Sequence, residues 1–502
     1  MSKGGESRPL LVNDDGWIIG ASDPSLTADD LREKMVATYE GTPVGVLLWS
    51  VGGHEVYKYE TLVGERFGEA YDKLDEPAEK RKAENLRRLI EDSGGPMTVL
   101  PRLCHEAGMG FFASVRMNEH YEIDPASPSY GGLRREHPEL LIGRPAEAIP
   151  EGTIEYGIRT GLDYAFTEVR GHMARVITEL FERFDVDGVE LDWFRHPAFF
   201  RVEEAYANRY LATDLVRRVR HGMDQVGRER GRRMELAVRV PPTLADSSRI
   251  GLDVSTWIAE GLVDIVIAGG GFVPFETPLE EFVEAARGTD CRIYGCIERL
   301  RPTENDDVVR AIASRYWDAG ASGIYLFNYF GQSPEWKRRV LGQIGDPAAL
   351  ARLDKQYEID SFERGGATSQ IGSAFRNAIP LTQLPAALEE TDSGVGPILR
   401  FSVTDDLGRV TSEDAPPHSV MTLRFENSSP EDEFEVRLNG AVVPLEAGGA
   451  AGEDGTLEVE VGSPPLKRGE NELEVRLLRR GATRDGPLAL KGVALTVSYG
   501  RP

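Results

Sequence analysis

The chain has 502 residues, which is too long for one ordinary core and predicts two or more domains. Its composition, with 40% hydrophobic and 28% charged residues, is that of a folded globular protein rather than of a disordered or fibrous one. The formal net charge of -25 disfavours nucleic acids and anionic membrane surfaces as partners, because both carry charge of the same sign.

The sequence has neither the pattern of a membrane protein nor that of a disulfide-rich secreted domain. No stretch approaches the ~18 uninterrupted apolar residues of a membrane span, and residues 1–12 lack the apolar run of a signal peptide. A cytoplasmic location is therefore expected for the chain as it stands, unless a leader has been removed. Cys104, Cys291 and Cys296 match neither a disulfide framework nor a zinc site, and we expect free thiols.

From residue 9 onward, short apolar runs alternate with segments of helical periodicity, such as 162–184 and 202–226, which is typical of a parallel sheet covered by helices. A closed (β/α)8 TIM barrel over residues 1–345 is the economical fold for eight repeats of strand and helix. The eight apolar runs are residues 9–13, 44–51, 110–117, 188–193, 235–240, 265–268, 292–297 and 323–327.

The alternative fold is a doubly wound open sheet, which often has a glycine-rich phosphate turn after its first strand. Here the first run continues into Asn-Asp-Asp-Gly-Trp at residues 13–17. The three glycines at 269–271 stand alone, with no phosphate-loop pattern after them, and are interpreted as room for a close approach of backbone or ligand.

Behind the barrel, the helical period gives way to a different pattern. Residues 346–390 begin with a helical stretch, continue as a mixture of Arg, Gly, Ser and Ala, and are expected to form a linker. Over residues 391–502, segments such as VMTLRFEN and TLEVEVG alternate polar and apolar residues between turns. This tail is predicted to be an antiparallel, jelly-roll-like β-sandwich.

In such a barrel the catalytic groups lie at the carboxyl ends of the strands, so the residues that close each apolar run are the candidates. The candidates for substrate contact are Asp14, Asp15, Trp17, Arg116, Asn118, Glu119, His120, Trp193, Arg195, His196, Arg239 and Asn328. His54, Tyr325 and Tyr329 are weaker candidates at the same end. Among the aromatic residues, Trp193 is the preferred platform for stacking on a sugar ring.

The carboxylates of the fourth and seventh runs are the candidate catalytic groups. Alternation places Glu190 and Asp192 on one side of their strand, the side that faces into the barrel. Glu298 closes the seventh run, so it can act opposite Asp192, with Glu190 as a substitute for Asp192. In this scheme Asp192 is the acid/base and Glu298 the nucleophile or base, or the roles are exchanged. The alternative for Glu298 is an ion pair with Arg239 or Arg299.

The segment DGVELDWFRHP at 187–197 resembles the fourth-strand motif of the family-10-like glycosyl hydrolases of bacteria, and more distantly those of chitinases and α-amylases. RMNEH at 116–120, AVRVPP at 237–242 and LPAALEE at 384–390 resemble the same group. The resemblance implies a barrel and glycosidase activity without identifying the sugar. Phe194 stands where the chitinase motif has its catalytic Glu, and Glu190 where the amylase motif has Arg.

The tail also has resemblances, in VRLNG at 436–440 and LKRGENEL at 466–473, to the jelly-roll modules that accompany many glycosidases. Such a module binds carbohydrate or braces the barrel, and the tail shows no aromatic platform that would favour binding.

The sequence thus predicts a glycoside hydrolase that cleaves an oligo- or polysaccharide with two carboxylates and needs neither an organic cofactor nor a metal ion. One alternative is a metal-dependent sugar isomerase or deacetylase with Asp14, His120, Glu190 and Asp192 as ligands. Another is a glycan-binding protein without catalysis. Three arginines near the mouth permit an acidic sugar as substrate or, as the preferred interpretation, only neutralise the carboxylates; they are Arg116, Arg195 and Arg239.

Overall fold

The protein is described by a computed structural model. It covers residues 8–21, 26–53, 55–69, 74–120, 122–127, 129–269, 277–298, 305–360, 383–390, 395–405, 407, 417–445, 451–452, 454–462, 466–481 and 486–500. His54, Arg299 and residues 270–271, which the sequence singles out, lie outside these ranges.

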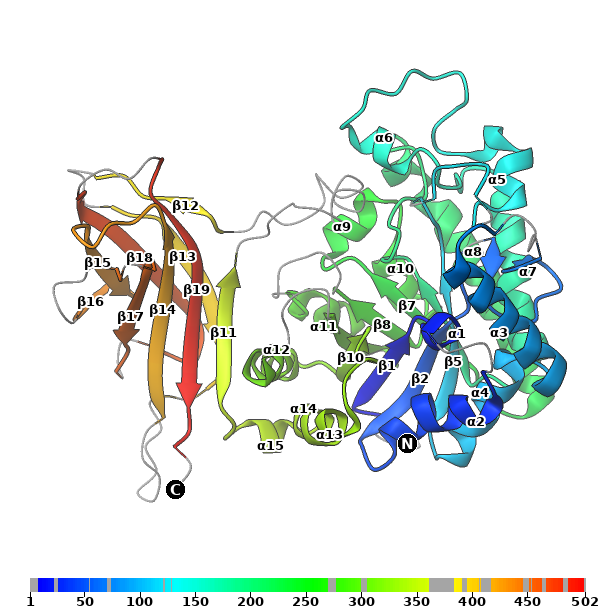
Figure 1. Ribbon diagram of the computed structural model, residues 1–502, viewed down its shortest axis with the longest axis horizontal. Helices are drawn as coiled ribbons and strands as arrows, with labels where there is room; N and C mark the ends of the chain where they lie inside the picture. The colour runs from blue at the N-terminus through cyan, green and yellow to red at the C-terminus, as the bar shows by residue number, and fades with distance from the viewer. Residues whose placement is uncertain are drawn as a thin grey trace.

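Eight parallel strands close into a barrel, which confirms the predicted fold class and forms the right-hand part of Figure 1. Around the barrel the strands follow one another in chain order, apart from a short pair outside it, so each connection returns to the neighbouring strand. The strands are β1 (Leu10–Asp14), β2 (Val44–Ser50), β5 (Gly110–Arg116), β6 (Gly188–Asp192), β7 (Glu235–Val240), β8 (Ile265–Ala268), β9 (Arg292–Glu298) and β10 (Gly323–Phe327).

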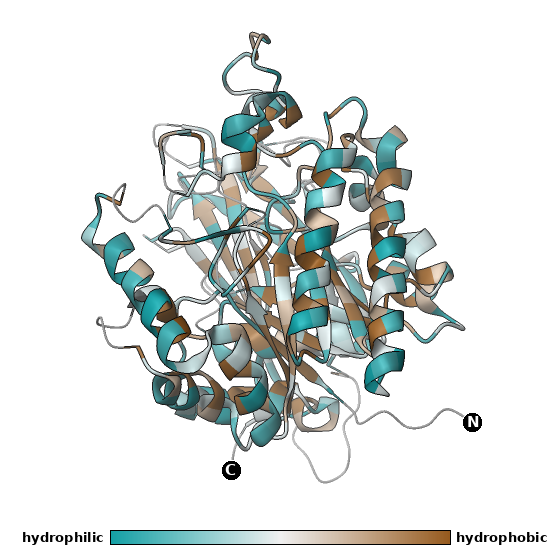
Figure 2. Ribbon diagram, turned by 90° about the vertical axis from the view of Figure 1, so that its right-hand side faces the viewer, coloured by the Kyte–Doolittle hydropathy of each residue, from teal (hydrophilic) through white to brown (hydrophobic). Residues whose placement is uncertain are grey.

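Amphipathic helices cover the outside of the barrel. In Figure 2 the strands are mostly brown, whereas the outward faces of the surrounding helices are teal. The longer helices are α3 (Pro77–Ser93), α4 (Pro96–Glu106), α7 (Thr167–Arg183), α8 (Ala205–Arg230) and α12 (Asp306–Asp318). The shorter ones are α1 (Ile18–Ala21), α2 (Ala28–Leu31), α9 (Leu244–Arg249), α10 (Val254–Ala259), α11 (Glu280–Ala286), α13 (Pro334–Trp336), α14 (Gly342–Ile344) and α15 (Pro347–Leu350). Single turns of π or 3-10 helix complete the layer at η1 (Arg32–Val36), η2 (Ala37–Tyr39) and η5 (Lys337–Leu341).

Two long connections build the rim at the carboxyl ends of the strands. The one after β2 carries the short pair β3 (Val56–Tyr57) and β4 (Glu65–Arg66). The one after β5 carries α5 (Gly132–Glu136), η4 (Pro138–Leu140) and α6 (Ile154–Ile158), which project at the top of Figure 1. A buried ion pair joins the two connections, because Arg134 Nε donates to Glu55 Oε2 over 2.6 Å. Both charges are shielded from water, so this pair fixes the rim as one unit.

The C-terminal part is a β-sandwich, as predicted. One sheet has the order β11-β19-β14-β17 with β12 beside β19, and the other has the order β13-β18-β15-β16. Buried residues alternate with exposed ones along its strands, and the inward residues form a separate hydrophobic core. The strands are β11 (Lys355–Asp360), β12 (Ala386–Ala387), β13 (Ile398–Val403), β14 (His418–Glu426), β15 (Glu433–Leu438), β16 (Ala441–Val443), β17 (Thr456–Glu460), β18 (Gly469–Arg479) and β19 (Ala489–Ser498).

The range 346–390, expected as a linker, contains α15 and the strands β11 and β12, which pair with β19. The sandwich contacts the barrel through α12, which lies between the two parts in Figure 1. Arg315 on this helix donates to the carbonyl of Ser402 over 2.8 and 3.0 Å. These contacts hold the sandwich against the barrel at α12. Among the described helices, none is long and apolar enough to cross a membrane.

Candidate active site

The inward-facing positions of the barrel change from apolar to charged toward the carboxyl ends of the strands. At mid-height the interior is filled by side chains such as Phe112, Ala237, Tyr294 and Tyr325. On β6 the alternation runs through Gly188, Glu190 and Asp192, while the residues between them pack against the helices. Each strand has period two, so the inward carboxylates follow directly from the sequence pattern.

Glu190 lies deepest among the candidate catalytic groups. It has no exposed surface, and its carboxyl oxygens accept a hydrogen bond from the Tyr325 hydroxyl over 2.7 Å and from Asn13 Nδ2 over 3.1 Å. Burial, and then the negative charge of Asp192, raises the pKa of Glu190 to about 7, against the lowering effects of Arg239 and of the hydrogen bond from Tyr325. Glu190 is thus a carboxyl group that changes protonation near neutral pH.

Asp192 and Glu298 share one arginine. Arg239 Nε donates to Asp192 Oδ1 over 2.9 Å and Nη2 to Oδ2 over 3.3 Å, and Nη1 lies 3.6 Å from Glu298 Oε2. All three side chains are almost fully buried, and the face of the Phe327 ring lies 3.9 Å from the guanidinium carbon. The ion pair that the sequence offers as the alternative for Glu298 is therefore present with Arg239. It also holds the carboxylates of β6 and β9 on one guanidinium.

Asp192 is further held by the turn that follows it. The backbone N–H groups of Phe194 and Arg195 donate to its Oδ1 over 3.1 and 3.0 Å. With Arg239, four donors point at this carboxylate, which stabilises its negative charge and fixes its orientation. This Asp turn is local, because it needs only the two residues after β6.

Asp14 and Asp15 follow β1 and have different surroundings. Asp14 is buried and accepts a hydrogen bond from the backbone N–H of Gly16 over 2.8 Å. Burial raises the pKa of Asp14 to about 7, partly offset by that hydrogen bond and by the positive charges of Lys337 and Lys58. Asp15 is partly exposed, with one oxygen 3.9 Å from Arg116 Nη2.

In the segment 116–120, the residues divide between the site and its scaffold. Asn118 is fully buried, and its side chain links two loops by hydrogen bonds. Its Nδ2 donates to the carbonyls of Leu162 and Ala198, and its Oδ1 accepts from the N–H of Leu162. Its amide is occupied by these contacts, which hold the rim in place. Glu119 is partly exposed beside Gly53.

Two buried histidines lie close in sequence to Asn118 and to its partner Ala198. The rings of His120 and His196 pack edge to face with centroids 5.1 Å apart. They join the loop after β5 to the loop after β6, directly beyond Asp192.

The aromatic candidates also separate into core and surface. Trp193 has no exposed surface and packs among Tyr164, Phe199 and Trp257. A ring without exposed area cannot stack on a sugar, so in this conformation Trp193 is a core residue. Trp17 is partly exposed and stacks on Phe330, with ring centroids 5.5 Å apart and planes at 15°.

Asn328, directly after β10, adopts the left-handed backbone conformation with φ 64°. Its Oδ1 is buried and has no hydrogen-bond partner among the residues that the structure describes. A strained backbone and an unsatisfied acceptor at a strand end are features that occur at binding sites.

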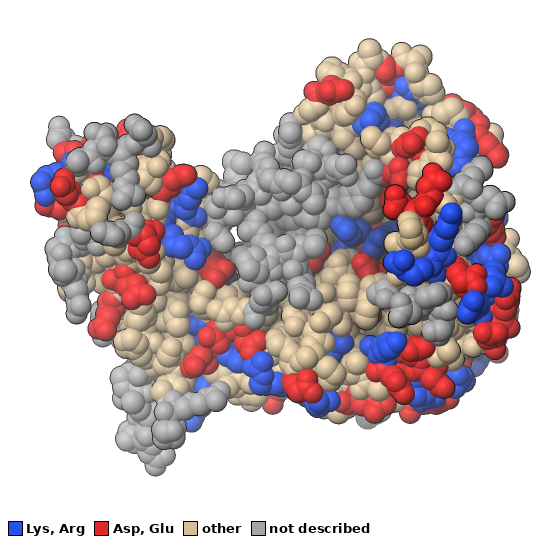
Figure 3. Space-filling model, in the orientation of Figure 1, with Lys and Arg blue, Asp and Glu red and all other residues tan. Residues whose placement is uncertain are grey.

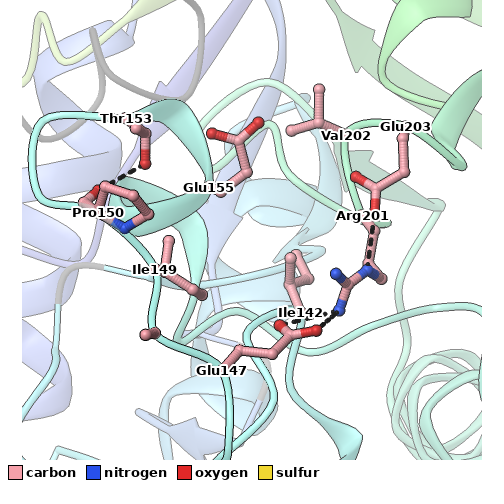
Figure 4. Close-up of a pocket in the computed structure, with 10 residues that line it drawn as sticks. Ile142, Glu147, Ile149, Pro150, Thr153, Glu155, Arg201, Val202 and Glu203 are labelled. Atoms are coloured by element: carbon pink, nitrogen blue, oxygen red, sulfur yellow. Dashed lines mark hydrogen bonds and ion pairs between the residues drawn. The ribbon is translucent and has the colours of Figure 1, made fainter.

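Two surface pockets lie along the rim, away from these carboxylates. Figure 4 shows the first, of about 330 Å³, where Arg201 reaches Glu147 over 2.8 Å and Glu203 over 2.9 Å. The second has about 340 Å³ and a more apolar lining that includes Phe200 and Tyr206. Neither pocket is lined by Asp192 or Glu298.

Sequence reasoning missed several residues at this end of the barrel. Asn13 lies two residues after Leu11, whose side chain faces into the barrel. The two-residue period of β1 therefore predicts that Asn13 faces inward as well. Lys58, Lys82 and Phe330 come from a loop, a helix and a strand end that no motif marks. Among the described residues, no group of three or more His, Cys, Asp or Glu side chains is arranged to hold a metal ion.

No known protein family and no curated protein matches the sequence. Three similar solved structures are glycoside hydrolases, the class that the sequence resembles. The endo-β-1,4-mannanase of Thermotoga petrophila is 12% identical, with 98% of each chain covered and a TM-score of 0.43. The PgaB glycoside hydrolase domain of Bordetella bronchiseptica is 11% identical over 67% of this chain and 98% of its own, with a TM-score of 0.42.

The family 36 α-galactosidase AgaA of Geobacillus stearothermophilus is 12% identical over 94% of this chain, with a TM-score of 0.41. The present chain spans 56% of its length. At these levels of similarity no residue role transfers to this protein.

Proposed function

We propose that the protein is a glycoside hydrolase that cleaves a bond between sugars with Asp192 and Glu298. The observation that carries the proposal is the single guanidinium of Arg239, which contacts both carboxylates at the carboxyl ends of β6 and β9. Glycoside hydrolysis needs two carboxyl groups on either side of the scissile bond, one to protonate the leaving oxygen and one to act on the anomeric carbon.

The contacts favour the exchanged order of roles. Asp192 receives two N–H donors from Arg239 and two from the backbone, which suits a carboxylate that stabilises or attacks an oxocarbenium-like carbon. Glu298 lies farther from Arg239, at 3.6 Å, so this guanidinium stabilises its charged form less, and we assign it the proton transfer to the leaving group. Glu190, buried behind Asp192, then acts as a proton reservoir that limits the negative charge in the barrel.

The metal-dependent alternative needs its carboxylates free for a cation. Two of the four ligands that it requires are engaged otherwise, because Asp192 is paired with Arg239 and Glu190 accepts from Tyr325 and Asn13. A positive guanidinium beside a divalent cation is electrostatically unfavourable. These contacts favour the two-carboxylate hydrolase.

The test is hydrolysis of a panel of aryl glycosides and polysaccharides by the wild type, Asp192→Asn and Glu298→Gln. Asp290→Asn and Glu182→Gln, at exposed positions that precede the amino ends of β9 and β6, are the matched controls. We expect a substrate that the wild type and both controls cleave, with a loss of about 10³-fold or more in kcat for each active-site variant. Activity that persists in both variants, or requires a divalent ion, would contradict the proposal.

A second readout separates the two possible stereochemical courses. Retention needs carboxyl groups about 5 Å apart, whereas inversion needs about 6.5 to 9.5 Å. Proton NMR of the first-formed product therefore reports the working distance between Asp192 and Glu298. Glycan binding without any turnover would identify the protein as a binding protein instead.

A further inference from the structure

We propose that the substrate carries a negatively charged group, a uronate carboxylate, and that Arg116 binds it beside Asp192 with help from Lys58 and Lys82. The inference builds on the proposed function, since it names the substrate class of the same site.

The three cations converge from separate parts of the chain. Arg116 ends β5 and its Cα is paired in register with that of Asp192, so it points into the mouth next to this carboxylate. Lys58 lies in the connection after β2, and its Nζ donates to the backbone carbonyl of Asp15 over 2.7 Å. Lys82 lies on α3, with Nζ 3.9 Å from the centre of the Phe67 ring. Figure 3 shows Lys and Arg side chains, in blue, interspersed with Asp and Glu side chains, in red, over the right-hand part of the molecule, which is the barrel.

Among the described residues, these cations have few close carboxylate partners. Within the described ranges, neither Lys58 nor Lys82 has a carboxylate at ion-pair distance, and Arg116 has only Asp15 at 3.9 Å. Arg116 Nε is buried without a hydrogen-bond acceptor among the described residues. The protein as a whole has a net charge of -25, so cations without close partners are unexpected at this place.

Arg116 and Arg239 differ in burial and in their ion pairs, a difference that the sequence does not predict. Arg239 is 1% exposed and its guanidinium is engaged by Asp192 and Glu298, so it neutralises the catalytic pair. The Arg116 side chain is 17% exposed and has no ion pair with either of them, so it remains accessible to a ligand.

Electrostatics at the cluster favour an anion. Burial, and then the positive charges of Lys82 and Arg116, lower the pKa of Lys58 to about 7, against the raising effects of Asp15 and Asp14. Burial, and then the charge of Arg195, lowers the pKa of Arg116. A bound negative charge would relieve this repulsion and return Lys58 to its protonated form.

The geometry of the groups selects a carboxylate. A guanidinium presents parallel N–H groups that match the two oxygens of a carboxylate, and a lysine adds a point charge beside it. A sugar placed with its anomeric carbon at Asp192 would direct a ring substituent toward the adjacent β5, where Arg116 ends. A sulfate ester shares the negative charge, and the experiment below distinguishes the two.

The test is calorimetric titration of the folded Glu298→Gln variant, in which turnover is suppressed and the cations are unchanged, with matched tetrasaccharides: uronates of the glucose, mannose and galactose series, their neutral counterparts, and their sulfated forms. We expect a uronate to bind at least ten-fold more tightly than its neutral counterpart, and the preference to weaken with added salt. Arg116→Met is expected to abolish the preference and Lys58→Met to reduce it. Arg102→Met, at an exposed position of α4, is the matched control and is expected to retain it.

Equal binding of neutral and acidic sugars, retention of the preference in Arg116→Met, or no binding of any uronate would overturn the inference. A sulfated sugar that binds more tightly than every uronate would overturn the choice of carboxylate. Binding is measured without turnover, so uronate binding without hydrolysis would refute the proposed hydrolase while the anion site stands.

Discussion

The two ends of the barrel differ in the number of partners that their buried charged side chains have. At the amino ends of the strands the buried carboxylates have several close donors: Asp264 accepts from Arg220 over 2.9 Å, from Arg233 over 3.0 Å and from the N–H of Leu236 over 2.8 Å. Asp187 nearby also has several close partners, which include Arg232 at 2.8 Å.

At the carboxyl ends, several ionisable groups are buried with few close charged partners. Glu190 and Asp14 both have raised pKa values because burial disfavours their charged forms, and Arg116 lies 3.9 Å from the carboxylate of Asp15. Unpaired charge costs stability, so it persists where function requires it. We infer that the charges of the amino end stabilise the fold, and we propose that those of the carboxyl end serve the reaction.

The largest expected effect comes from matched arginines at the two ends. Arg239 and Arg220 are both buried and each contacts two carboxylates, Arg239 at the carboxyl end and Arg220 at the amino end. We expect Arg239→Met to lower kcat by about 10³-fold, because the catalytic pair loses its bridging charge, and Arg220→Met to keep kcat within about two-fold. Steady-state kinetics on the best substrate measures both. Equal losses in the two variants would remove the functional contrast between the ends.

The next effect concerns stability. Asp264→Asn removes one member of a buried charge network and is expected to lower the free energy of unfolding by about 3 to 5 kcal/mol, with kcat unchanged. Urea denaturation of the folded variant gives this value. Asp290→Asn is the exposed control and is expected to stay within about 0.5 kcal/mol of the wild type. A loss below about 1 kcal/mol in Asp264→Asn would show that the pairing at the amino end does not stabilise the fold.

A third prediction uses the pH dependence of stability. The folded-state pKa of Glu190 is raised from 4.5 to about 7, so between these values the folded protein holds a proton that the unfolded chain has released. Its stabilising contribution is therefore complete below about pH 4.5 and is lost as the pH rises toward 7. The shift corresponds to on the order of 3 kcal/mol.

Glu190→Gln cannot ionise, so its free energy of unfolding should fall less than that of the wild type between pH 4.5 and 7. Denaturation midpoints at several pH values measure the two slopes. Asp14, whose pKa is also raised to about 7, contributes the same sign in both proteins and leaves the difference intact. Parallel slopes would contradict the buried, protonated state of Glu190.

The smallest expected effect lies at the rim. Trp17→Ala removes a partly exposed ring that stacks on Phe330, and we expect KM to rise roughly five-fold, or about 1 kcal/mol, with little change in kcat. Because the rings act together, Phe330→Ala should have a similar effect and the double variant less than the sum. An unchanged KM in all three variants would exclude this pair as a sugar platform.

The sequence by itself determined the eight strands, the barrel class, the sandwich and the inward parity of Glu190 and Asp192. Strand alternation and helical periodicity are local properties. When one face of a strand or helix is buried, apolar residues recur at the spacing of that face, and this spacing can be recognised in the sequence. The Asp192 turn onto the N–H groups of Phe194 and Arg195 is local in the same way.

Only the tertiary structure decided which charges meet. The bridge from Arg239 to Glu298 crosses from β7 to β9, and the approach of Lys58 to Asp15 joins two connections, so closure of the barrel sets both. The burial of Trp193 depends likewise on Tyr164 and Trp257, which are distant in sequence. The two-residue period of a strand predicts whether a side chain faces into the barrel or outward. The partners of that side chain depend on other strands, helices and loops, which come into contact with it only when the whole domain packs.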